Sequence, residues 1–419
     1  MEKIVIKGGK PLNGSINASG AKNAVLPIIA ASIVGTGTSI IKNVPHLDDV
    51  TTMNTLLIQM GVELVVHDTT NVEICADNIH TPRAPYETVK TMRASILALG
   101  PLLTKYGTAE ISLPGGCAIG ARPVDIHLKG LEAMGAKINV ENGYIIAKAE
   151  RLHGCHFYME KVTVTGTENL LIAATLAKGE TVLENCATEP EVIDLTKYLI
   201  NMGAKIKGIG TAILTIQGVD KLNGCEHTVI PDRIEVGTFL VAAAATGGEI
   251  TINNANPDDL KAVLRKLRQT GAVISTTENS ISLNMHGKRP KPVNIDTAPH
   301  PDFPTDMQAQ FCALNAIASG YSIVTENLFE NRFMHINELI RMGADITIAG
   351  NQAVINGVKN LNGAPTTATD LRASASLVIA GLVAEGTTEI FDIHYIDRGY
   401  EIIEEKLNQL SADIKRVTF

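Results

Sequence analysis

Tryptophan is absent from this chain of 419 residues, and aromatic side chains make up only 4% of it. The core must therefore be built from aliphatic side chains, which suits small helices packed closely together. No apolar run reaches the roughly 18 residues that a membrane span needs, and the first residues lack the apolar stretch of a signal peptide. We therefore expect a cytoplasmic protein with no membrane association.

A surplus of positive charge is also missing, because the formal net charge is −8. Broad nucleic-acid surfaces need a basic face, so we expect no nucleic-acid partner. The six cysteines include no pair with CxxC spacing, and no His or Cys cluster has the spacing of a metal site. We expect no metal and no disulfide framework, and we expect every cysteine except Cys117 to be chemically inert.

One pattern, related to Leu-x-x-Met-Gly-Ala, occurs six times along the chain. Its fifth position falls at Gly61, Gly135, Gly203, Gly271, Gly343 and Ser411. Each copy predicts an amphipathic helix that ends at a residue in the left-handed conformation and is followed by a strand. A second pattern, an Ala-rich helix followed by Gly and a strand, is marked by Gly37, Gly107, Gly179, Gly248, Gly320 and Gly386. Both markers repeat at about 70 residues, which predicts six similar units.

A chain of this length exceeds the usual size of a single core, so two domains of three units each are expected. We place the first domain at residues 22–230, and the second at residues 1–21 together with 231–419, with the N-terminal strands returning to complete the last unit. The resulting fold class is α/β. An open solenoid is the alternative, but it would need polar capping repeats, and none is evident.

Charged or anion-binding residues recur where the Ala-rich helices are expected to begin. They are Lys22, Asn23, Arg93, Glu168, Asn169, Arg233, Asp306, Gln308 and Arg372, and the second helices add Arg122, Arg332 and Arg398. Cations at helix N-termini oppose the helix dipole unless an anion lies between them and the backbone N–H groups. The pattern favours a ligand with several negative charges, although any single one of these residues is as well explained as a solvated charge.

One loop is longer than its five counterparts. The distance between the two glycine markers is 28 residues in the second unit and 23 to 25 in the others. The extra residues fall around Cys117, in a glycine-rich segment that also contains Arg122. A nearby cation lowers the pKa of a thiol and makes it reactive, so Cys117 is the candidate nucleophile or acid. The alternative is a small residue that simply fills the loop.

Three aspartates have two interpretations each. Asp370 is expected to cap a helix, Asp306 is equally compatible with capping and with chemistry, and Asp232 is expected to cap or to pair with Arg233. His127 is expected either to line a pocket or to lie on the surface.

Several ordered segments together resemble the enolpyruvyl transferase family, and within it the group of UDP-N-acetylglucosamine 1-carboxyvinyltransferases. They contain Lys22-Asn23, Arg93, the Cys117 segment through Arg122-Pro123-Val124-Asp125, Pro304-Thr305-Asp306, Arg332, Asp370-Leu371-Arg372 and Asp397-Arg398. The resemblance covers essentially the whole chain. It implies two inside-out α/β barrel domains, each of three units, with an active-site cleft between the domains. The chain differs from some members at Asp48, where they carry Lys, and at Thr165, where they carry Gly.

The resemblance also implies roles for individual residues. Phosphoenolpyruvate would be bound by Lys22, Asn23, Arg122, Arg332, Arg372 and Arg398, with Lys22 and Arg398 also counted as catalytic. Cys117 would protonate the enolpyruvyl methylene carbon and be the residue that fosfomycin alkylates, and Asp306 would take the proton of the sugar 3-hydroxyl. The UDP-sugar would contact Arg93, Arg122, Pro123, Val124, Asp125, Ile126, His127, Lys161, Val162, Thr163, Val164, Asp306 and Leu328.

The implied activity is transfer of the enolpyruvyl group of phosphoenolpyruvate to UDP-N-acetylglucosamine with release of phosphate, by addition and elimination. It is the first committed step of peptidoglycan synthesis, and thereby of cell-wall formation, cell shape and division. No metal or organic cofactor is required. Two alternatives remain: a transferase acting on shikimate 3-phosphate, and a repeat protein that binds UDP-sugars without turnover. The long Cys117 loop favours the UDP-sugar over shikimate 3-phosphate.

Overall fold

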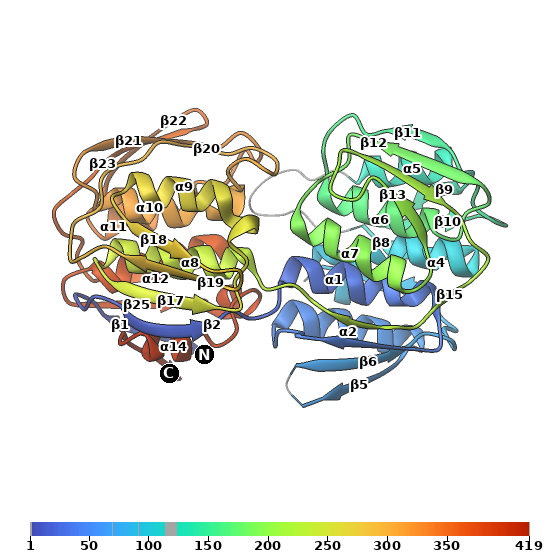
Figure 1. The fold of residues 1–419 in the computed structure, drawn as a ribbon, viewed down its shortest axis with the longest axis horizontal. Helices are drawn as coiled ribbons and strands as arrows, with labels where there is room; N and C mark the ends of the chain where they lie inside the picture. The colour runs from blue at the N-terminus through green and yellow to red at the C-terminus, as the bar shows by residue number, and fades with distance from the viewer. Residues whose placement is uncertain (1, 69, 91, 114–123, 419) are drawn as a thin grey trace. The chain divides into compact units, whose positions relative to one another are not determined.

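The computed structural model describes all residues except 1, 69, 91, 114–123 and 419. Its described residues divide into two compact units (Figure 1). Unit 1 contains residues 2–19 and 231–418, and unit 2 contains residues 20–113 and 124–230. Each unit has its own hydrophobic core.

Unit 1 contains three four-stranded sheets. In spatial order, the strands of each are β2 (Asn13–Asn17), β17 (Glu249–Asn253), β19 (Ser280–Asn284) and β18 (Val273–Thr276); β20 (Ile295–Asp296), β21 (Tyr321–Thr325), β23 (Gln352–Asn356) and β22 (Asp345–Ala349); and β24 (Pro365–Thr367), β25 (Thr387–Phe391), β1 (Glu2–Lys7) and β26 (Asp413–Thr418).

The sheets of unit 2 follow the same plan. They are β16 (Glu226–Thr228), β4 (Thr38–Lys42), β6 (Asn71–Cys75) and β5 (Glu63–His67); β7 (Arg83–Ala84), β8 (Thr108–Ser112), β10 (Tyr144–Lys148) and β9 (Lys137–Glu141); and β11 (His156–Tyr158), β12 (Glu180–Glu184), β14 (Ile213–Gln217) and β13 (Lys205–Lys207). A short pair, β15 (Leu222–Asn223) with β3 (Gly35–Thr36), is added to them.

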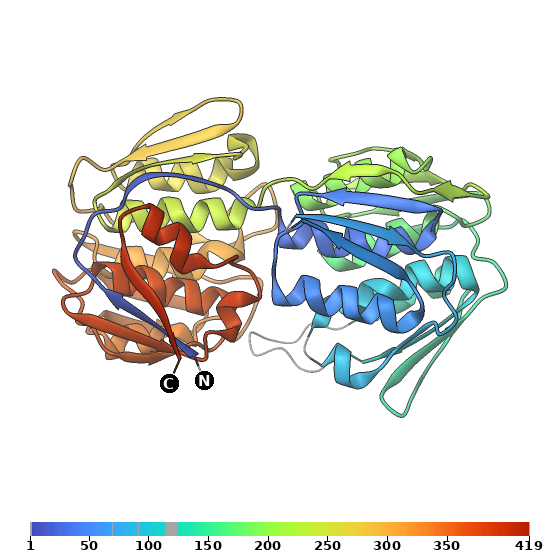
Figure 2. The same ribbon diagram turned by 90° about the horizontal axis from the view of Figure 1, so that it is seen from below.

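All six four-stranded sheets share one hydrogen-bonding pattern. The first strand in spatial order runs parallel to the second, and the remaining neighbours are antiparallel, as in β11, β12, β14 and β13. In the last sheet of unit 1 the N-terminal strand β1 lies between β25 and β26. The two ends of the chain therefore lie side by side, as both views show (Figure 2). The prediction of six similar units is confirmed by this shared topology.

Three inner helices occupy the middle of each unit. In unit 1 they are α8 (Arg233–Ala245), α10 (Gln308–Ala316), preceded by the single turn Thr305–Met307, and α12 (Leu371–Val383). In unit 2 they are α1 (Lys22–Ala31), continued by the turn Ser32–Val34, α4 (Leu99–Tyr106), preceded by the turn Arg93–Ala98, and α6 (Val164–Ala174). The three helices of a unit pack against one another. They are buried on nearly every face: in α8, for example, every residue after Arg233 is buried.

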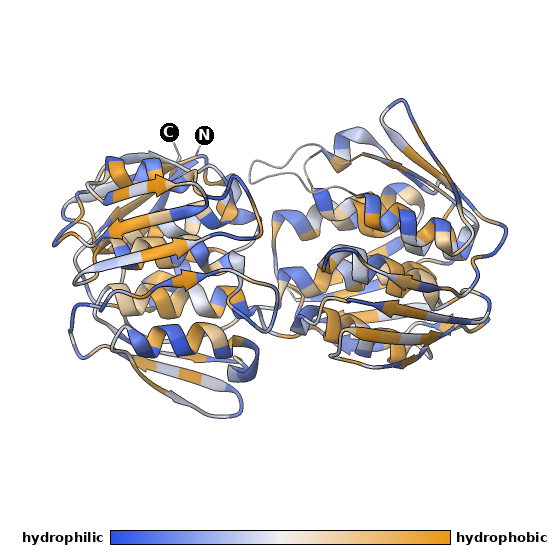
Figure 3. Ribbon diagram, turned by 90° about the horizontal axis from the view of Figure 1, so that it is seen from above, coloured by the Kyte–Doolittle hydropathy of each residue, from blue (hydrophilic) through white to orange (hydrophobic). Residues whose placement is uncertain are grey.

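Outer helices connect the strands within the repeats. They are α2 (Asp48–Met60), α5 (Asp125–Ala133) and α7 (Pro190–Asn201) in unit 2, with the short α3 (Tyr86–Val89). Unit 1 has α9 (Lys261–Gln269), preceded by the turn Pro257–Leu260, α11 (His335–Arg341), α13 (His394–Asp397) and α14 (Ile403–Gln409). Apolar residues are concentrated on the helices and strands, and hydrophilic residues in the connecting loops (Figure 3).

The repeat marker behaves as its sequence predicts. Five glycines that follow outer helices have φ between 95° and 109°, and Ser411 at the sixth position has φ of 71°. The positions are Gly61, Gly135, Gly203, Gly271 and Gly343. The left-handed conformation that ends each of these helices is therefore confirmed at all six positions. Among the described residues, no helix is both long and apolar enough to cross a membrane.

In the described part of the chain, the boundary between the units falls at Ser19–Gly20 and at Ile230–Pro231. Ser19 and Gly20 each make close contacts within their own unit. In unit 1, the Ser19 backbone N–H donates to Glu235 at 2.7 Å, and Lys406 donates to both Ser19 and Glu235, at 2.7 and 2.6 Å. In unit 2, a Cβ on Gly20 would lie 1.8 Å from the carbonyl oxygen of Asn43, so only glycine fits there.

We expect Lys406→Met to lower the free energy of unfolding of unit 1 by about 3 kcal/mol. The Glu235 side chain is only 3% exposed, and removing its cation leaves a buried carboxylate without a counter-charge. Urea unfolding followed by circular dichroism measures the change. Lys415→Met, at an exposed position, is the matched control and should change stability by less than about 0.5 kcal/mol. Equal stability of the two variants would show that the Lys406 pair does not contribute.

Candidate active site

Three aspartates at the starts of the inner helices of unit 1 have two different roles. Asp232 caps α8 by accepting from the backbone N–H groups of residues 234 and 235, at 2.8 and 3.1 Å. Asp370 caps α12 by accepting from residues 372 and 373, at 2.8 and 3.0 Å. Both capping predictions are confirmed. The third, Asp306, makes no cap and instead binds two arginines.

Asp306 joins two arginines that the sequence places 40 residues apart. Its Oδ1 accepts from Nη2 of Arg332 at 2.7 Å, and its Oδ2 accepts from Nη2 of Arg372 at 2.9 Å. The two arginine side chains are each 5% exposed, whereas that of Asp306 is 26% exposed. The expected site residues Asp306, Arg332 and Arg372 therefore form one cluster, with the carboxylate as its accessible member.

The charges of this cluster control its acidity. Burial alone would raise the pKa of Asp306, but the guanidinium groups of Arg372 and Arg332 outweigh it and hold the pKa well below its ordinary value. The Asp306 carboxylate is therefore ionised at neutral pH, and it is a weak base while both arginines bind it.

Each arginine is also held from its other side. Nη1 of Arg372 donates to the hydroxyl of Tyr400 at 3.3 Å, and that hydroxyl lies 2.9 Å from the hydroxyl of Thr238. Nη1 of Arg332 donates to the hydroxyl of Thr305 at 2.8 Å. These contacts fix the directions in which the guanidinium groups point.

Glu326 organises the loop that leads to Arg332. Its Oε2 accepts from Thr305 at 2.8 Å, and its Oε1 accepts from Thr297 and from the backbone N–H of Leu328, each at 2.9 Å. The side chain is buried, and it follows β21 directly. Leu328, an expected contact of the UDP-sugar, is 38% exposed on this loop. Glu326 and Tyr400 were not among the residues that the sequence singled out for a role, because neither stands in a repeated or charged pattern.

Arg398, another expected cation of unit 1, follows the short helix α13 and is half-buried. Gln308 begins α10 beside Asp306. Neither polar atom of the Gln308 amide has a hydrogen-bond partner within the described part of the chain, although the side chain is fully buried.

In unit 2, Lys22 and Asn23 begin the inner helix α1, and both are half-buried. The ammonium group of Lys22 lies 3.2 Å from Asp49, which is buried in the first turn of α2. Arg93 likewise begins the turn that precedes α4 and is half-buried. The expectation that cations stand at inner-helix starts is thus met at Lys22 and Arg93, as it is at Arg233 in unit 1.

Glu168 and Asn169 do not stand where the sequence placed them. Helix α6 begins at Val164, with Thr163 as its cap, so both residues lie more than one turn inside it. Burial, together with the nearby Glu191 and Glu189, raises the pKa of Glu168 well above its ordinary value. The prediction that a charged or anion-binding group stands at this helix start was therefore wrong for these two residues.

His127 is buried on α5 and hydrogen-bonded, so the interpretation as a surface residue was wrong. The oxygen of the Asn169 side chain accepts from the backbone N–H of Gly100, so its NH₂ group faces Nδ1 of His127, at 2.9 Å. Nδ1 must therefore accept, which requires a neutral ring with its proton on Nε2, 3.4 Å from the hydroxyl of Thr165. Burial and the charge of Arg93 lower the pKa of His127 to about 4, in agreement with this neutral form.

The other expected contacts of the UDP-sugar in unit 2 lie at two helix starts. Val124 precedes α5, which begins with Asp125 and Ile126, and all three are half-buried. Lys161 and Val162 are exposed before α6, and Thr163 and Val164 are half-buried at its start. Cys117, Arg122 and Pro123 lie outside the described residues.

Four of the described cysteines have thiols with a raised pKa, which makes them poor nucleophiles. Burial raises the pKa of Cys186 and Cys225 to about 11, and it also raises that of Cys155 and Cys312. A thiol with a raised pKa carries little thiolate at neutral pH. Among the described residues, no group of three or more His, Cys, Asp or Glu side chains is arranged to hold a metal ion.

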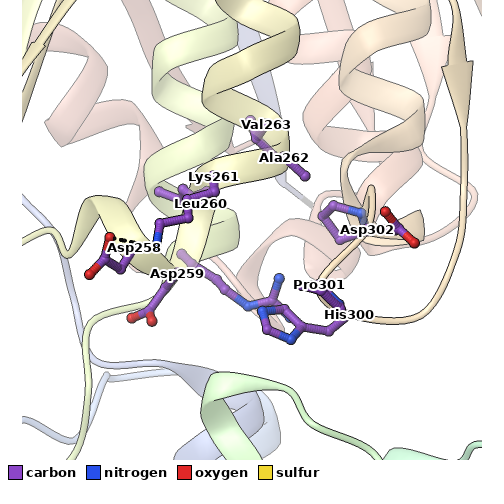
Figure 4. Close-up of a pocket in the computed structure, with 11 residues that line it drawn as sticks. Asp258, Asp259, Leu260, Lys261, Ala262, Val263, His300, Pro301 and Asp302 are labelled. Atoms are coloured by element: carbon purple, nitrogen blue, oxygen red, sulfur yellow. Dashed lines mark ion pairs between the residues drawn. The ribbon is translucent and has the colours of Figure 1, made fainter.

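A small pocket of about 170 Å³ lies in unit 1 at the starts of α8 and α9 (Figure 4). Its lining includes Arg233, Asp259, His300 and Pro304. Asp306 and its two arginines do not line it. An ion pair at the rim joins the exposed side chains of Asp258 and Lys261 at 3.0 Å. Pro304 in the pocket wall is only two residues before Asp306 in the chain, but the Asp306 cluster itself lies outside the pocket.

Comparison with known proteins relates this architecture to one family. Residues 6–407 match the family model described as EPSP synthase (3-phosphoshikimate 1-carboxyvinyltransferase). The chain is 60% identical over 417 residues to a UDP-N-acetylglucosamine 1-carboxyvinyltransferase of Halorhodospira halophila, and the match covers 100% of both chains.

Two solved structures have the same fold. The enolpyruvyl transferase NikO from Streptomyces tendae matches with a TM-score of 0.89 at 23% identity, over 100% of this chain and 99% of the other. An EPSP synthase from Acinetobacter baumannii matches with a TM-score of 0.77 at 19% identity, over 100% of both chains. The expected α/β fold class is therefore confirmed as that of the enolpyruvyl transferases.

We expect Glu326→Ala to lower the free energy of unfolding of unit 1 by about 3 kcal/mol, because buried N–H and hydroxyl donors lose a charged acceptor. Chemical denaturation measures the change. Glu278→Ala, at an exposed position, is the control and should have almost no effect. A loss for Glu326→Ala no larger than that of the control would contradict the organising role.

Proposed function

Since this chain belongs to the EPSP synthase family, we propose that it transfers the enolpyruvyl group of phosphoenolpyruvate to the 3-hydroxyl of UDP-N-acetylglucosamine and releases phosphate. The observation that carries this choice of acceptor is the 60% identity to a UDP-N-acetylglucosamine 1-carboxyvinyltransferase along the whole of both chains. The family model and one of the structural relatives are named for the shikimate 3-phosphate reaction, but the structural relatives are only 19% and 23% identical and indicate the fold alone.

The chemistry requires an acid, a base and cations. In the addition step, the methylene carbon of phosphoenolpyruvate takes a proton from the acid, and the sugar oxygen bonds to the central carbon as its own proton passes to the base. In the elimination step, the carbon–oxygen bond to phosphate breaks and the new methyl group loses a proton, which restores the double bond. Proton donors and acceptors placed on opposite sides of the reacting carbon, with cations for the departing phosphate, accelerate such a sequence.

Asp306 is the base in this proposal, and Cys117 is the acid. The partly exposed carboxylate of Asp306 beside two buried arginines supports a site that holds a carboxylate substrate and accepts a proton. Arg332 and Arg372 bind the phosphoenolpyruvate carboxylate, and Lys22, Arg122 and Arg398 bind its phosphate. Asn23 contacts the same substrate.

The UDP-sugar is assigned to the two helix starts of unit 2 and to the Leu328 loop. The residues are Arg93, Arg122 to His127, Lys161 to Val164, Asp306 and Leu328. His127 is neutral and bonded to Asn169 and Thr165, so its part in this assignment is to shape the site rather than to carry charge.

In the cell, this activity supplies peptidoglycan synthesis, and so we place the protein in the cytoplasm, in the pathway that supports cell-wall growth, shape and division. Fosfomycin is proposed as an inhibitor that alkylates Cys117. No metal or organic cofactor takes part in the proposed reaction.

A phosphate-release assay with phosphoenolpyruvate tests the function. With UDP-N-acetylglucosamine as acceptor, we expect one phosphate for each enolpyruvyl product, and with shikimate 3-phosphate we expect none. Release with shikimate 3-phosphate but not with UDP-N-acetylglucosamine would support the alternative reaction. Binding of the UDP-sugar, measured by calorimetry, without phosphate release would instead support a non-catalytic binding protein.

The role of Cys117 is tested by two substitutions. Cys117→Ala removes the proton donor and should abolish phosphate release, whereas Cys117→Asp should retain part of it because a carboxylic acid also donates a proton. Fosfomycin should form a covalent adduct with the protein that retains Cys117 and with neither variant, as mass spectrometry can measure. Normal turnover by Cys117→Ala would overturn the acid role. Cys186→Ala, at a buried thiol with a raised pKa, is the control and should remain alkylated at Cys117.

A further inference from the structure

The carboxylate of Asp306 occupies the nitrogen atoms at which a bound carboxylate would meet the arginine pair. Each arginine already uses Nη1 for another partner, Thr305 for Arg332 and Tyr400 for Arg372. Each turns its Nη2 to Asp306. With side chains only 5% exposed, the arginines have little freedom to offer a different edge. A carboxylate that binds both arginines at these Nη2 atoms therefore competes with Asp306, which is the accessible member of the cluster.

We propose that the carboxylate of phosphoenolpyruvate displaces Asp306 from Arg332 and Arg372, so that Asp306 becomes an effective base only once this substrate is bound. The inference rests on the proposed function, which supplies phosphoenolpyruvate as the ligand of the arginine pair. The two arginines both bind one substrate and increase the basicity of the group that deprotonates the other.

The physical basis is competition between two anions for two cations. While Asp306 holds both guanidinium groups, they stabilise its ionised form and weaken it as a base. When a second carboxylate takes those N–H groups, Asp306 loses its hydrogen bonds and gains an anionic neighbour. Both changes raise its pKa and increase its tendency to accept a proton.

The rest of the cluster is arranged to remain in place during this exchange. Tyr400 and Asp232 face Arg372. His335 lies near both Arg332 and Asp370, and Glu326 reaches Arg332 through Thr305. Tyr400 and Thr305 bond to Nη1 atoms, which Asp306 does not use. The arginines therefore keep their positions when Asp306 leaves, and only the carboxylate changes partners.

This coupling has a consequence for the reaction. The sugar hydroxyl loses its proton only when phosphoenolpyruvate is present to receive the oxygen. Deprotonation and addition are thereby tied to the same ternary complex.

Calorimetric titration of phosphoenolpyruvate into Asp306→Asn tests the competition without any turnover. Removing the competing charge should tighten phosphoenolpyruvate binding at least tenfold relative to the unmodified protein. Inorganic phosphate, which has no carboxylate, should change by less than about twofold. Asp302→Asn makes the same charge change at an exposed position on the neighbouring loop, and it should leave both affinities unchanged.

The outcomes separate the possibilities. Unchanged or weaker phosphoenolpyruvate binding to Asp306→Asn overturns the inference, and so does an equal gain for inorganic phosphate, which would be a general charge effect. Tenfold tighter phosphoenolpyruvate binding by Asp306→Asn, combined with no phosphate release by the unmodified protein with UDP-N-acetylglucosamine, would retain the competition and refute the proposed acceptor. The two failures are therefore distinguishable.

A second measurement uses the unmodified protein, in case Asp306→Asn does not fold. Pyruvate keeps its carboxylate ionised between pH 7 and pH 5, and displaced Asp306 should take up protons as the pH falls. Pyruvate affinity should therefore rise at least threefold from pH 7 to pH 5. Burial lowers the pKa of His335 to about 4, so that residue stays largely neutral across this range. Affinity that is constant or falls between pH 7 and pH 5 contradicts the displacement.

Discussion

A helix that is buried on nearly every face has to be enclosed, and the inner helices of both units are of this kind. In α8, α10 and α12 most residues after the first turn are apolar or small, and nearly all are buried. Three such helices can bury one flank against each other, and the outward flanks need sheets. The three four-stranded sheets of each unit supply that cover. Because the sides of these helices are buried, only residues near the helix ends are accessible to a ligand.

Three aspartates at the starts of the inner helices of unit 1 are stabilised by different partners. Asp232 and Asp370 satisfy free backbone N–H groups, which is the ordinary use of an aspartate at this place. Asp306 occupies a comparable place one turn before α10 but gives both of its oxygens to arginines. Two guanidinium groups that are almost completely buried would be costly without that carboxylate. The departure from capping is therefore the local sign of a function that needs both charges.

The sequence predicts the parts of this structure that depend on neighbouring residues. Gly61 and its counterparts locate the outer-helix ends, because a left-handed residue is required there, and the regular spacing of the markers predicts six units. Asp370 is predictable as a cap for the same local reason. The contacts of Glu326 with Thr305, of Tyr400 with Arg372 and of Asn169 with Ile96 are not, since these partners lie 21, 28 and 73 residues apart in the chain. The error over Glu168 has a local origin instead: a cap at Thr163 begins α6 a full turn earlier than the charged residue suggests.

The fold of this chain is compatible with very different sequences. Structures with TM-scores of 0.89 and 0.77 share the architecture with this chain at only 23% and 19% identity. The enclosed helices tolerate many combinations of aliphatic residues, because their requirement is burial and volume. His127 shows the opposite constraint. Its neutral form depends on the orientation of the Asn169 amide, which is fixed in turn by the backbone of Gly100. A substitution at any of these three positions changes which hydrogen bonds the helix end can offer, while the fold around it persists.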